Sequence, residues 1–260
     1  MVLIPALLLA AVGSLQAVEI RRIPATDAGQ GVASDGRYLY AIDNHAIAKL
    51  DAATGKQVAR WDGDPALYSH INSCTVDRMI LICAASNFPG VPMTSMIERF
   101  ETKNLRHIST QSLGHGYGSL TWVVQHDGDW WACFANYDGR GGEPGRDHRY
   151  TLLVRYDRHW QEKAQWHFPP EVLDRIAPKS ASGGAWGNDG LLYVTGHDRP
   201  EVYALRVPED GGVLQLMATI AISTGGQAID WDHASQRTLW SIERKTKELV
   251  ASRIPPIPGD

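Results

Sequence analysis

Gln30-Gly31-Val32-Ala33-Ser34-Asp35-Gly36, followed by Tyr38-Leu39-Tyr40-Ala41-Ile42-Asp43, is the stretch that decides the fold. Both runs have the short apolar pattern of β-strands, and the Asp-Gly pair that separates them is typical of a tight turn. Two further strands are expected at residues 46–51 and 57–61, with the turn Thr54-Gly55-Lys56 between them. Four short strands joined by tight turns are the unit of a propeller blade.

The same order of strands and turns recurs along the rest of the chain. Repetition of one supersecondary unit indicates a repeat architecture. Short strands with regular turns also build sandwiches and barrels, but the repeated order of motifs favours a propeller. The expected strands lie at residues 70–73, 79–84, 95–100 and 107–113, then 118–121, 129–134, 151–156 and 161–168, then 183–186, 191–195, 201–206 and 214–222, and finally 227–231, 238–242 and 248–254.

The last unit lacks an outer strand, because the chain there ends in Pro255, Pro256 and Pro258. Residues 19–23 alternate in a way that supplies the missing strand, and closing the ring with them removes an open sheet edge. The sequence therefore predicts an all-β fold, a five-bladed β-propeller closed by its N-terminal strand. Residues 18–260 form this single domain, with a short helix expected at residues 169–176 between the third and fourth blades.

The N-terminal segment is the long apolar stretch of the chain, at residues 2–18, and it is interrupted by Gly13, Ser14 and Gln16. It is too short to span a bilayer but suits a signal peptide at residues 1–17, cleaved after Ala17. A mis-assigned start or a buried strand is the alternative. The prediction is a periplasmic or secreted protein with no membrane span in the mature chain.

Charge and cysteine content narrow the function classes. The net charge is −4 with a pI near 6.2, and no run of Lys or Arg provides the basic surface of a nucleic-acid binder. Three cysteines do not make a disulfide framework. Cys74 and Cys83 face each other across a hairpin that turns at Asp77-Arg78, within disulfide distance. Two buried thiols packed as small apolar groups are the alternative that the sequence favours.

Blade geometry brings scattered polar residues to one end of the central channel. In a four-stranded meander, the start of the first strand and the end of the second lie on the same face. The first-strand positions are Gln30, His70, Asn72, Gly118, Ser119, Ser182, Gly183 and Gln227. The second-strand positions are Asp43, Asn44, His45, Ser86, Asn87, Asn136, Tyr137, His197, Asp198, Glu243 and Arg244. The opposite face carries Asp- and Gly-rich turns, expected to serve only as turns.

Two long insertions, at residues 88–94 and 138–150, leave the same polar face. Long loops on a rigid scaffold often build binding sites. Arg146, Asp147 and His148 are expected to lean over the channel as a lid. The structural alternative is that polar residues at strand ends only satisfy backbone groups.

The candidate roles follow from side-chain chemistry. Imidazoles and carboxylates serve as general acids and bases, so His70, His197, Asp198 and Glu243 are the candidate catalytic residues. Arg244 can hold a substrate carboxylate, and aromatic faces can stack on a sugar. His70 and His197 are candidate ligands of one divalent metal ion, with no cofactor as the alternative. The candidate substrate-binding residues are Gln30, Asn44, Asn72, Asn87, Tyr117, Trp122, Asn136, Tyr137, His148, Gln227 and Arg244.

Residues 30–56 resemble the repeats of bacterial lactonase-like and YncE-like propellers, and the whole chain is similar in layout to bacterial propellers that carry the label cycloisomerase. The same stretch is loosely similar to plant-type glutaminyl cyclotransferases, which are five-bladed. Their Thr-Gln-Gly-Leu motif is partly matched by Gly29-Gln30-Gly31-Val32, but their Glu-Ser-Thr-Gly segment is replaced by Ala41-Ile42-Asp43-Asn44.

No nucleophile elbow or phosphate loop is present, and paired carboxylates of a glycosidase are not evident. The sequence therefore predicts acid–base chemistry on a small carbohydrate, sugar acid or lactone, by a lyase, lactone hydrolase or cycloisomerase. The two alternatives are a non-catalytic propeller that binds a ligand or a protein, and a glutaminyl-peptide cyclotransferase.

Overall fold

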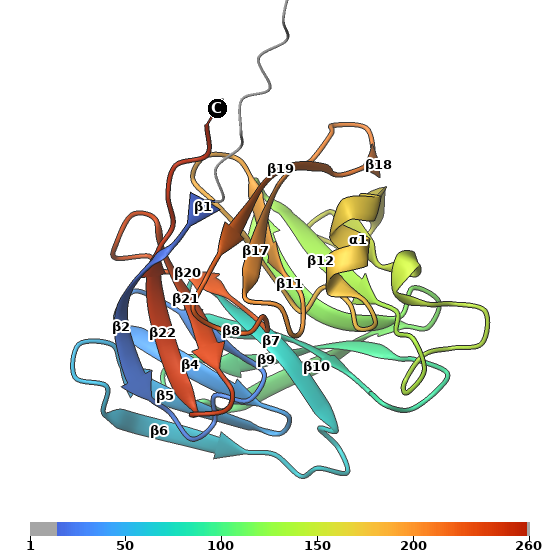
Figure 1. Ribbon diagram of the computed structural model, residues 1–260. Helices are drawn as coiled ribbons and strands as arrows, with labels where there is room; N and C mark the ends of the chain where they lie inside the picture. The colour runs from blue at the N-terminus through green and yellow to red at the C-terminus, as the bar shows by residue number, and fades with distance from the viewer. Residues whose placement is uncertain (1–14, 259–260) are drawn as a thin grey trace, which may run out of the picture.

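The computed structural model describes residues 15–258, whose strands form five sheets (Figure 1). Four consecutive antiparallel strands make up each of the first two sheets. Blade 1 consists of β3 (Gly31–Ser34), β4 (Tyr38–Asp43), β5 (Ala46–Asp51) and β6 (Gln57–Asp62). Blade 2 consists of β7 (His70–Asp77), β8 (Ile80–Ser86), β9 (Ser95–Glu101) and β10 (His107–Gly114).

The other three sheets follow the same plan, with short additions at their outer edges. Blade 3 has β11 (Ser119–His126), β12 (Asp129–Ala135), β13 (Leu152–Tyr156) and β14 (Glu162–His167), with β18 (Gly212–Val213) parallel to β14. Blade 4 has β15 (Gly183–Trp186), β16 (Leu192–Thr195), β17 (Glu201–Arg206) and β19 (Gln215–Ala221), with β1 (Leu15–Gln16) parallel to β19. Blade 5 has β20 (Asp230–Trp231), β21 (Thr238–Glu243), β22 (Glu248–Arg253) and β2 (Val18–Pro24).

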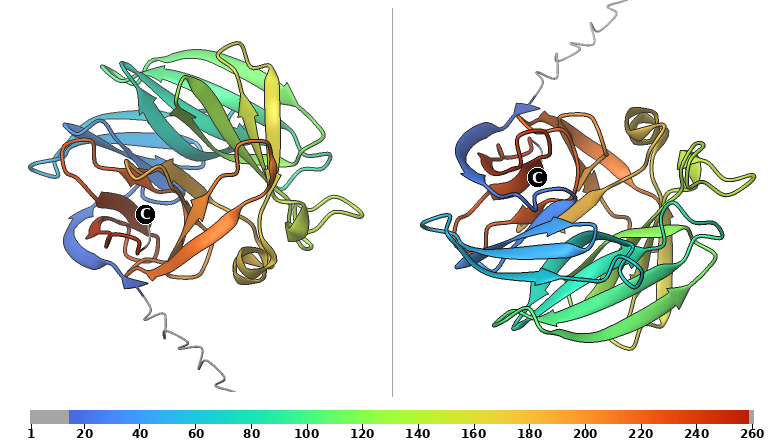
Figure 2. Two further views of the ribbon diagram at one scale, coloured as in Figure 1. Left: turned by 90° about the horizontal axis from the view of Figure 1, so that it is seen from above. Right: turned by 90° about the horizontal axis from the view of Figure 1, so that it is seen from below.

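The innermost strands β3, β7, β11, β15 and β20 contact one another in sequence around the centre. In Figure 2 the blades follow the chain around this centre from blue to red. The fold is a five-bladed β-propeller, as the repeated pattern predicts. The innermost strands pack tightly: a Cβ on Gly31 would lie 2.4 Å from the Cβ of Ala228, and one on Gly183 would lie 2.6 Å from the carbonyl oxygen of Gln227. Glycine is required where the blades converge this closely.

The N-terminal strand closes the ring, as predicted. β2 pairs antiparallel with β22, with Val18 opposite Arg253 and Ile23 opposite Leu249. β1 adds a second contact, because Leu15 and Ala17 pack on the hydrophobic core between blades 4 and 5. The predicted boundary after Ala17 falls between β1 and β2, and residues 1–14 of the predicted signal peptide lie outside the described residues.

The hydrophobic core is divided among the interfaces between neighbouring blades. Tyr40 and Phe100 are buried between blades 1 and 2, and Trp122 and Tyr203 are buried between blades 3 and 4. Burying such large side chains stabilises each interface and fixes the blades relative to one another. The inner strand ends at both mouths of the channel are therefore held on a rigid ring.

The predicted helix is α1 (Pro170–Ile176), which connects blades 3 and 4 and buries Val172, Leu173 and Ile176. A short 3₁₀ helix, η1 (His148–Tyr150), lies in the loop after β12. Within residues 15–258 neither helix is long enough to cross a lipid bilayer.

Cys74 and Cys83 form a disulfide across the innermost hairpin of blade 2. The predicted register is right, since Cys74 on β7 lies directly opposite Cys83 on β8. The interpretation as two free thiols was wrong, because cross-strand neighbours in this register are close enough to bond. Cys133 is a buried thiol.

Candidate functional site

A pocket with a volume of about 390 Å³ opens at the mouth of the channel where the innermost strands begin. We call it the cationic pocket. The predicted site residues on its wall are Gln30, Asn44, His70, Asn72, Tyr137, His197, Gln227 and Arg244. The other lining residues are Ser69, Phe88, Pro89, Thr121, Arg140, Lys179 and Ser182.

His70 begins β7 and is held by the loop after β4. Its Nδ1 lies 2.6 Å from Oδ1 of Asn44, which also accepts a hydrogen bond of 3.0 Å from Nε2 of Gln30. Because that oxygen is an acceptor, Nδ1 of His70 carries the proton and Nε2 keeps its lone pair. Burial lowers the pKa of His70 to about 4, so the ring is neutral at neutral pH.

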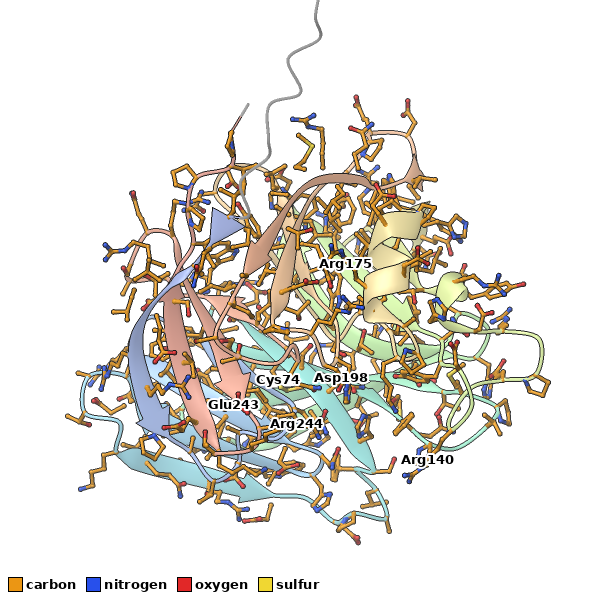
Figure 3. All side chains as sticks on the ribbon, viewed as in Figure 1. Cys74, Arg140, Arg175, Asp198, Glu243 and Arg244 are labelled. Carbon is orange, nitrogen blue, oxygen red and sulfur yellow. A yellow bond between two sulfur atoms is a disulfide. The ribbon has the colours of Figure 1, made fainter. Side chains whose placement is uncertain are left out.

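His197 follows β16 and forms a pair with its neighbour Asp198. Its Nδ1 lies 2.6 Å from Oδ1 of Asp198, and its Nε2 lies 3.3 Å from Nη1 of Arg244. Figure 3 labels Asp198 and Arg244 on the ribbon. Asp198 accepts the Nδ1 proton, which leaves Nε2 as the basic nitrogen facing the guanidinium. Burial lowers the pKa of His197, although the hydrogen bond to Asp198 acts in the opposite direction. His197 is therefore a neutral imidazole with its lone pair directed toward a cation.

Gln227 holds the loop that carries His197. Its side-chain amide donates a 3.0 Å hydrogen bond to the carbonyl of His197, and its backbone N–H donates to the carbonyl of Gly196. The φ angle of Gln227 is +74°, in the left-handed region that side chains rarely adopt. Such conformations persist where surrounding contacts impose them, and they are common at functional sites.

The two long loops build one wall of the pocket together, on the face where they were predicted. The backbone N–H of Met93 donates a 2.7 Å hydrogen bond to Oε1 of Glu143. Phe88 packs edge to face against Tyr137 and tilts against His70. This packing places Phe88 and Arg140, which come from different loops, on the wall of the same pocket.

Positive charge dominates this pocket. Arg140, Lys179 and Arg244 line it, and no Asp or Glu does so among the residues that the structure describes. Arg244 was predicted from its position at a strand end, whereas Arg140 and Lys179 were not predicted. Both lie in irregular segments that are joined by a 3.0 Å hydrogen bond from the N–H of Asp138 to the carbonyl of Pro178. The positive charge of Arg140 and Lys179 could have marked them as candidates for an anion site. Their spacing in the sequence does not show that the two segments meet.

Several predicted site residues lie elsewhere. Trp122 is fully buried between blades 3 and 4, because a bulge between Leu120 and Trp122 changes which face of β11 each side chain occupies. Tyr117 directs its hydroxyl 2.5 Å from Oε2 of Glu162 on the outer strand β14. Neither aromatic ring lines the pocket, so their predicted role in substrate binding is not supported by their position.

Three more predicted residues serve the backbone. Asn136 is buried and donates to the carbonyls of Tyr117 and Tyr150. The side chain of Asn87 accepts the N–H of Thr94 and donates to the carbonyl of Pro92, both at the C-terminal end of the 88–94 loop. Glu243 ends β21 and accepts the N–H of Lys245, outside the pocket. The structural alternative, in which strand-end polar groups satisfy backbone atoms, describes these positions.

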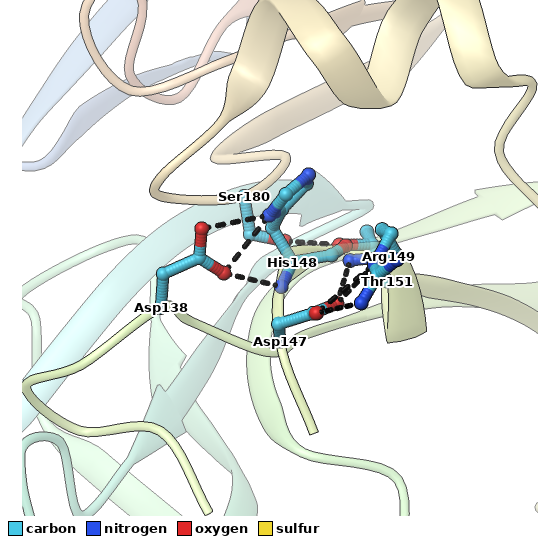
Figure 4. Close-up of polar contacts among 6 residues, drawn as sticks. All are labelled: Asp138, Asp147, His148, Arg149, Thr151 and Ser180. Atoms are coloured by element: carbon cyan, nitrogen blue, oxygen red, sulfur yellow. Dashed lines mark hydrogen bonds and ion pairs between the residues drawn. The ribbon is translucent and has the colours of Figure 1, made fainter. Parts of the chain in front are cut away.

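The expected lid of Arg146, Asp147 and His148 does not lie over the pocket. Nδ1 of His148 contacts both carboxylate oxygens of Asp138, at 2.9 and 3.0 Å (Figure 4). Asp147 caps η1 and binds the guanidinium of Arg149, while Arg146 donates to the carbonyl of Gly116. Asp138, Asp147 and His148 are close enough to share a metal ion, but their ligand atoms are already engaged by these partners.

The donor set around His70 and His197 does not fit a divalent metal ion. Divalent cations favour carboxylate ligands beside imidazole, whereas this pocket places guanidinium and ammonium groups there. The same charges favour an anionic ligand, since Arg binds carboxylates in bidentate fashion. The site offers a neutral base, hydrogen-bonding amides and a cationic wall.

Comparison with known proteins establishes the fold. No family model matches the chain, and no curated protein matches its sequence. The PQQ-bound aldose sugar dehydrogenase of Streptomyces coelicolor aligns with a TM-score of 0.57 and 9% identity, over 91% of this chain and 97% of that chain. A luciferin-regenerating enzyme aligns with a TM-score of 0.53 and 10% identity, over 92% and 96%. The hydrazine synthase of Kuenenia stuttgartiensis aligns with a TM-score of 0.52 and 9% identity, over 87% and 83%.

These likenesses show a propeller. At about 10% sequence identity, structural similarity shows a shared fold and does not show a shared reaction. The narrower resemblances to lactonase-like propellers, cycloisomerases and glutaminyl cyclotransferases stay predictions.

Proposed function

We propose that the protein is an exported enzyme that acts on a small sugar acid or its lactone by acid–base chemistry in the cationic pocket. The observation that carries the proposal is the 3.3 Å approach of Nη1 of Arg244 to Nε2 of His197, in a pocket also lined by Arg140 and Lys179. A general base and a binding site for a carboxylate therefore lie within a few ångströms of each other.

In the proposed reaction, the carboxylate of a sugar acid, or the carbonyl oxygen of a lactone, accepts a hydrogen bond from the guanidinium of Arg244 and draws it away from His197. Nε2 of His197 then removes a proton, from a carbon beside the carboxylate in a lyase or isomerase, or from a water molecule in a lactone hydrolase. In a lyase, the C–H electron pair moves onto a carboxylate oxygen and returns to expel the alkoxide from the neighbouring carbon, and that alkoxide takes up the proton from His197; in an isomerase, the pair returns to form a new C–H bond with that proton. In a lactone hydrolase, the hydroxide oxygen bonds to the lactone carbonyl carbon, the C=O electron pair moves onto the oxygen, and its return breaks the ring C–O bond, so that the ring alkoxide takes the proton from His197. In each case the pocket cations stabilise the negative charge on the oxygen. Asp198 stabilises the imidazolium that results.

Two further observations support the proposal. The Cys74–Cys83 disulfide suits an oxidising compartment and so supports export. A pocket of about 390 Å³ suits a small molecule and not a polymer segment.

The test is a turnover assay followed by ¹H NMR on uronic acids, aldonic acids and their lactones, each paired with the neutral sugar of the same ring. The enzymes are the wild type, His197→Ala, and His167→Ala as a matched control on the exposed outer strand β14. We expect turnover of an acid or lactone by the wild type and the control, with His197→Ala slower by about 10²-fold or more.

Three outcomes contradict the proposal. Turnover that is undiminished in His197→Ala removes His197 as the base. Binding of acids without turnover by the wild type indicates a non-catalytic propeller. Cyclisation of peptides with N-terminal Gln, with no reaction of sugar acids, indicates a glutaminyl cyclotransferase.

A further inference from the structure

A second cavity, of about 750 Å³, opens at the opposite mouth of the channel, where the innermost strands end. β7 connects the two sites, since His70 at its start lines the cationic pocket and Asp77 at its end lines the second cavity. On β11, Thr121 and Val124 line the two sites and are three residues apart, roughly 10 Å along a strand. The face predicted to carry only turns therefore also carries a cavity.

The charge of this second cavity is opposite to that of the cationic pocket. Asp77, Asp189, Asp230 and Asp232 line it, and Arg237 is its one Lys or Arg among the described residues. Arg237 is already neutralised by a 2.8 Å contact with Asp189 and also donates to the carbonyl of Ile254. Asp77 is paired with Arg78, at 3.3 Å. Asp230 and Asp232 have no such Lys or Arg partner among the described residues, and we call this cavity the acidic pocket.

Asp230 is the most confined of these carboxylates. Only 6% of its surface is exposed, and its oxygens accept the backbone N–H groups of Ser34 and Trp231 at 2.9 and 3.0 Å. No Lys or Arg forms an ion pair with it within residues 15–258. A buried carboxylate without a Lys or Arg partner is costly, and burial raises the pKa of Asp230, while the imidazole of His233 on the same cavity wall acts in the opposite direction. A cation in the cavity would supply the missing partner.

Two indole rings complete the wall of the acidic pocket. Trp186 lines it and is stacked on His126, with ring centres 4.0 Å apart and an interplanar angle of 7°. Trp231 lines it and is held edge-on against Tyr193. Both rings are therefore fixed in place by the blades behind them. Aromatic faces beside carboxylates are the combination that recognises ammonium groups, through cation–π attraction and charge pairing together.

We propose that the acidic pocket binds a small organic cation, an alkylammonium compound, with its charge near Asp230 and its alkyl groups against Trp186 and Trp231. The carboxylates and the indole rings are independent features that favour the same ligand chemistry. A simple metal cation would leave the indole faces unused, and a neutral sugar would leave the charge of Asp230 uncompensated.

The test compares choline with 3,3-dimethylbutan-1-ol, its uncharged analogue of the same shape, by titration calorimetry on the wild-type protein. We expect choline to bind and the alcohol to bind weaker by about tenfold or more. Asp230→Asn should weaken choline binding by about tenfold, whereas Asp174→Asn, a matched change on the exposed face of α1, should leave it unchanged.

Equal affinity for choline and the alcohol would overturn the proposal, as would binding of Ca²⁺ without binding of choline. No heat of binding for choline up to about 50 mM would also overturn it. The comparison between choline and the alcohol uses only the wild-type protein, so it decides the question even if Asp230→Asn does not fold.

Discussion

Asp198 accepts the Nδ1 proton of His197 across 2.6 Å, and this one contact decides which imidazole nitrogen faces the pocket. The carboxylate itself is largely exposed, whereas the imidazole is more enclosed. In the proposed mechanism, Asp198 is therefore a positioning residue, and His197 is the group that meets the substrate.

Asp198→Asn tests this division of roles. An amide can present its N–H to Nδ1, which places the proton on Nε2 and removes the base. We expect kcat to fall by about 10- to 100-fold with KM little changed, less than for a fully buried acid because water can partly replace Asp198. The acidic limb of the pH–rate profile should also move, which a purely structural role would not cause. Asp174→Asn is the control, and an unchanged kcat and pH profile for Asp198→Asn would contradict the assignment.

His70 should make the stability of the protein depend on pH. Its pKa is lowered from 6.5 to about 4 in the folded state, so below pH 6.5 the unfolded chain binds a proton that the folded protein does not. The free energy of unfolding should therefore fall as the pH drops from 6.5 toward 4, by up to about 1.4 kcal/mol per pH unit from this group. Urea unfolding of the wild type and His70→Gln at several pH values measures how the free energy of unfolding depends on pH. A slope as steep in His70→Gln as in the wild type would show that His70 is not responsible.

The Cys74–Cys83 disulfide should stabilise the folded protein. The two residues are nine positions apart, and closing a loop of this length lowers the entropy of the unfolded chain and so raises its free energy by about 2–3 kcal/mol at 25 °C. The double substitution Cys74→Ser with Cys83→Ser should lower the free energy of unfolding by about that amount, measured by denaturant titration. A reductant should destabilise the wild type and leave the double variant unaffected. Equal sensitivity of the two proteins to reductant would show that the bond does not form.

Substitution of Trp122 tests whether this residue stabilises the core or binds the substrate. It is fully buried between blades 3 and 4, so Trp122→Ala should lower the free energy of unfolding by about 3–5 kcal/mol. Affinity for a sugar acid, measured on the folded variant, should stay at the wild-type value. Arg244→Gln should do the reverse, with loss of affinity and little change in stability. Loss of affinity in Trp122→Ala at unchanged stability would restore its predicted role in the site.

The fold could be predicted because it depends on local patterns. The alternation in residues 19–23 and the strands at 183–186 and 201–206 are set by side-chain period and turn chemistry, which the sequence displays directly. Blade geometry then placed Gln30, His70 and His197 at one mouth, because strand ends follow from strand directions alone.

The rest of the site depends on contacts that sequence spacing does not encode. The bulge in β11 places Trp122 in the core, and the two loops of the pocket wall are joined by long-range contacts such as the hydrogen bond from Met93 to Glu143. The acidic pocket was missed for a related reason. Asp189 and Asp230 belong to sequences typical of turns and strands, and only the ring of blades brings them together.

The most direct test is the affinity of the wild-type protein and Arg244→Gln for galacturonate and for galactose, measured by titration calorimetry under one buffer condition. The cationic pocket predicts that the wild type binds galacturonate tighter than galactose by about tenfold or more, and that Arg244→Gln abolishes most of this preference. Equal affinity of the wild type for the acid and the neutral sugar, or a preference that survives in Arg244→Gln, would contradict it.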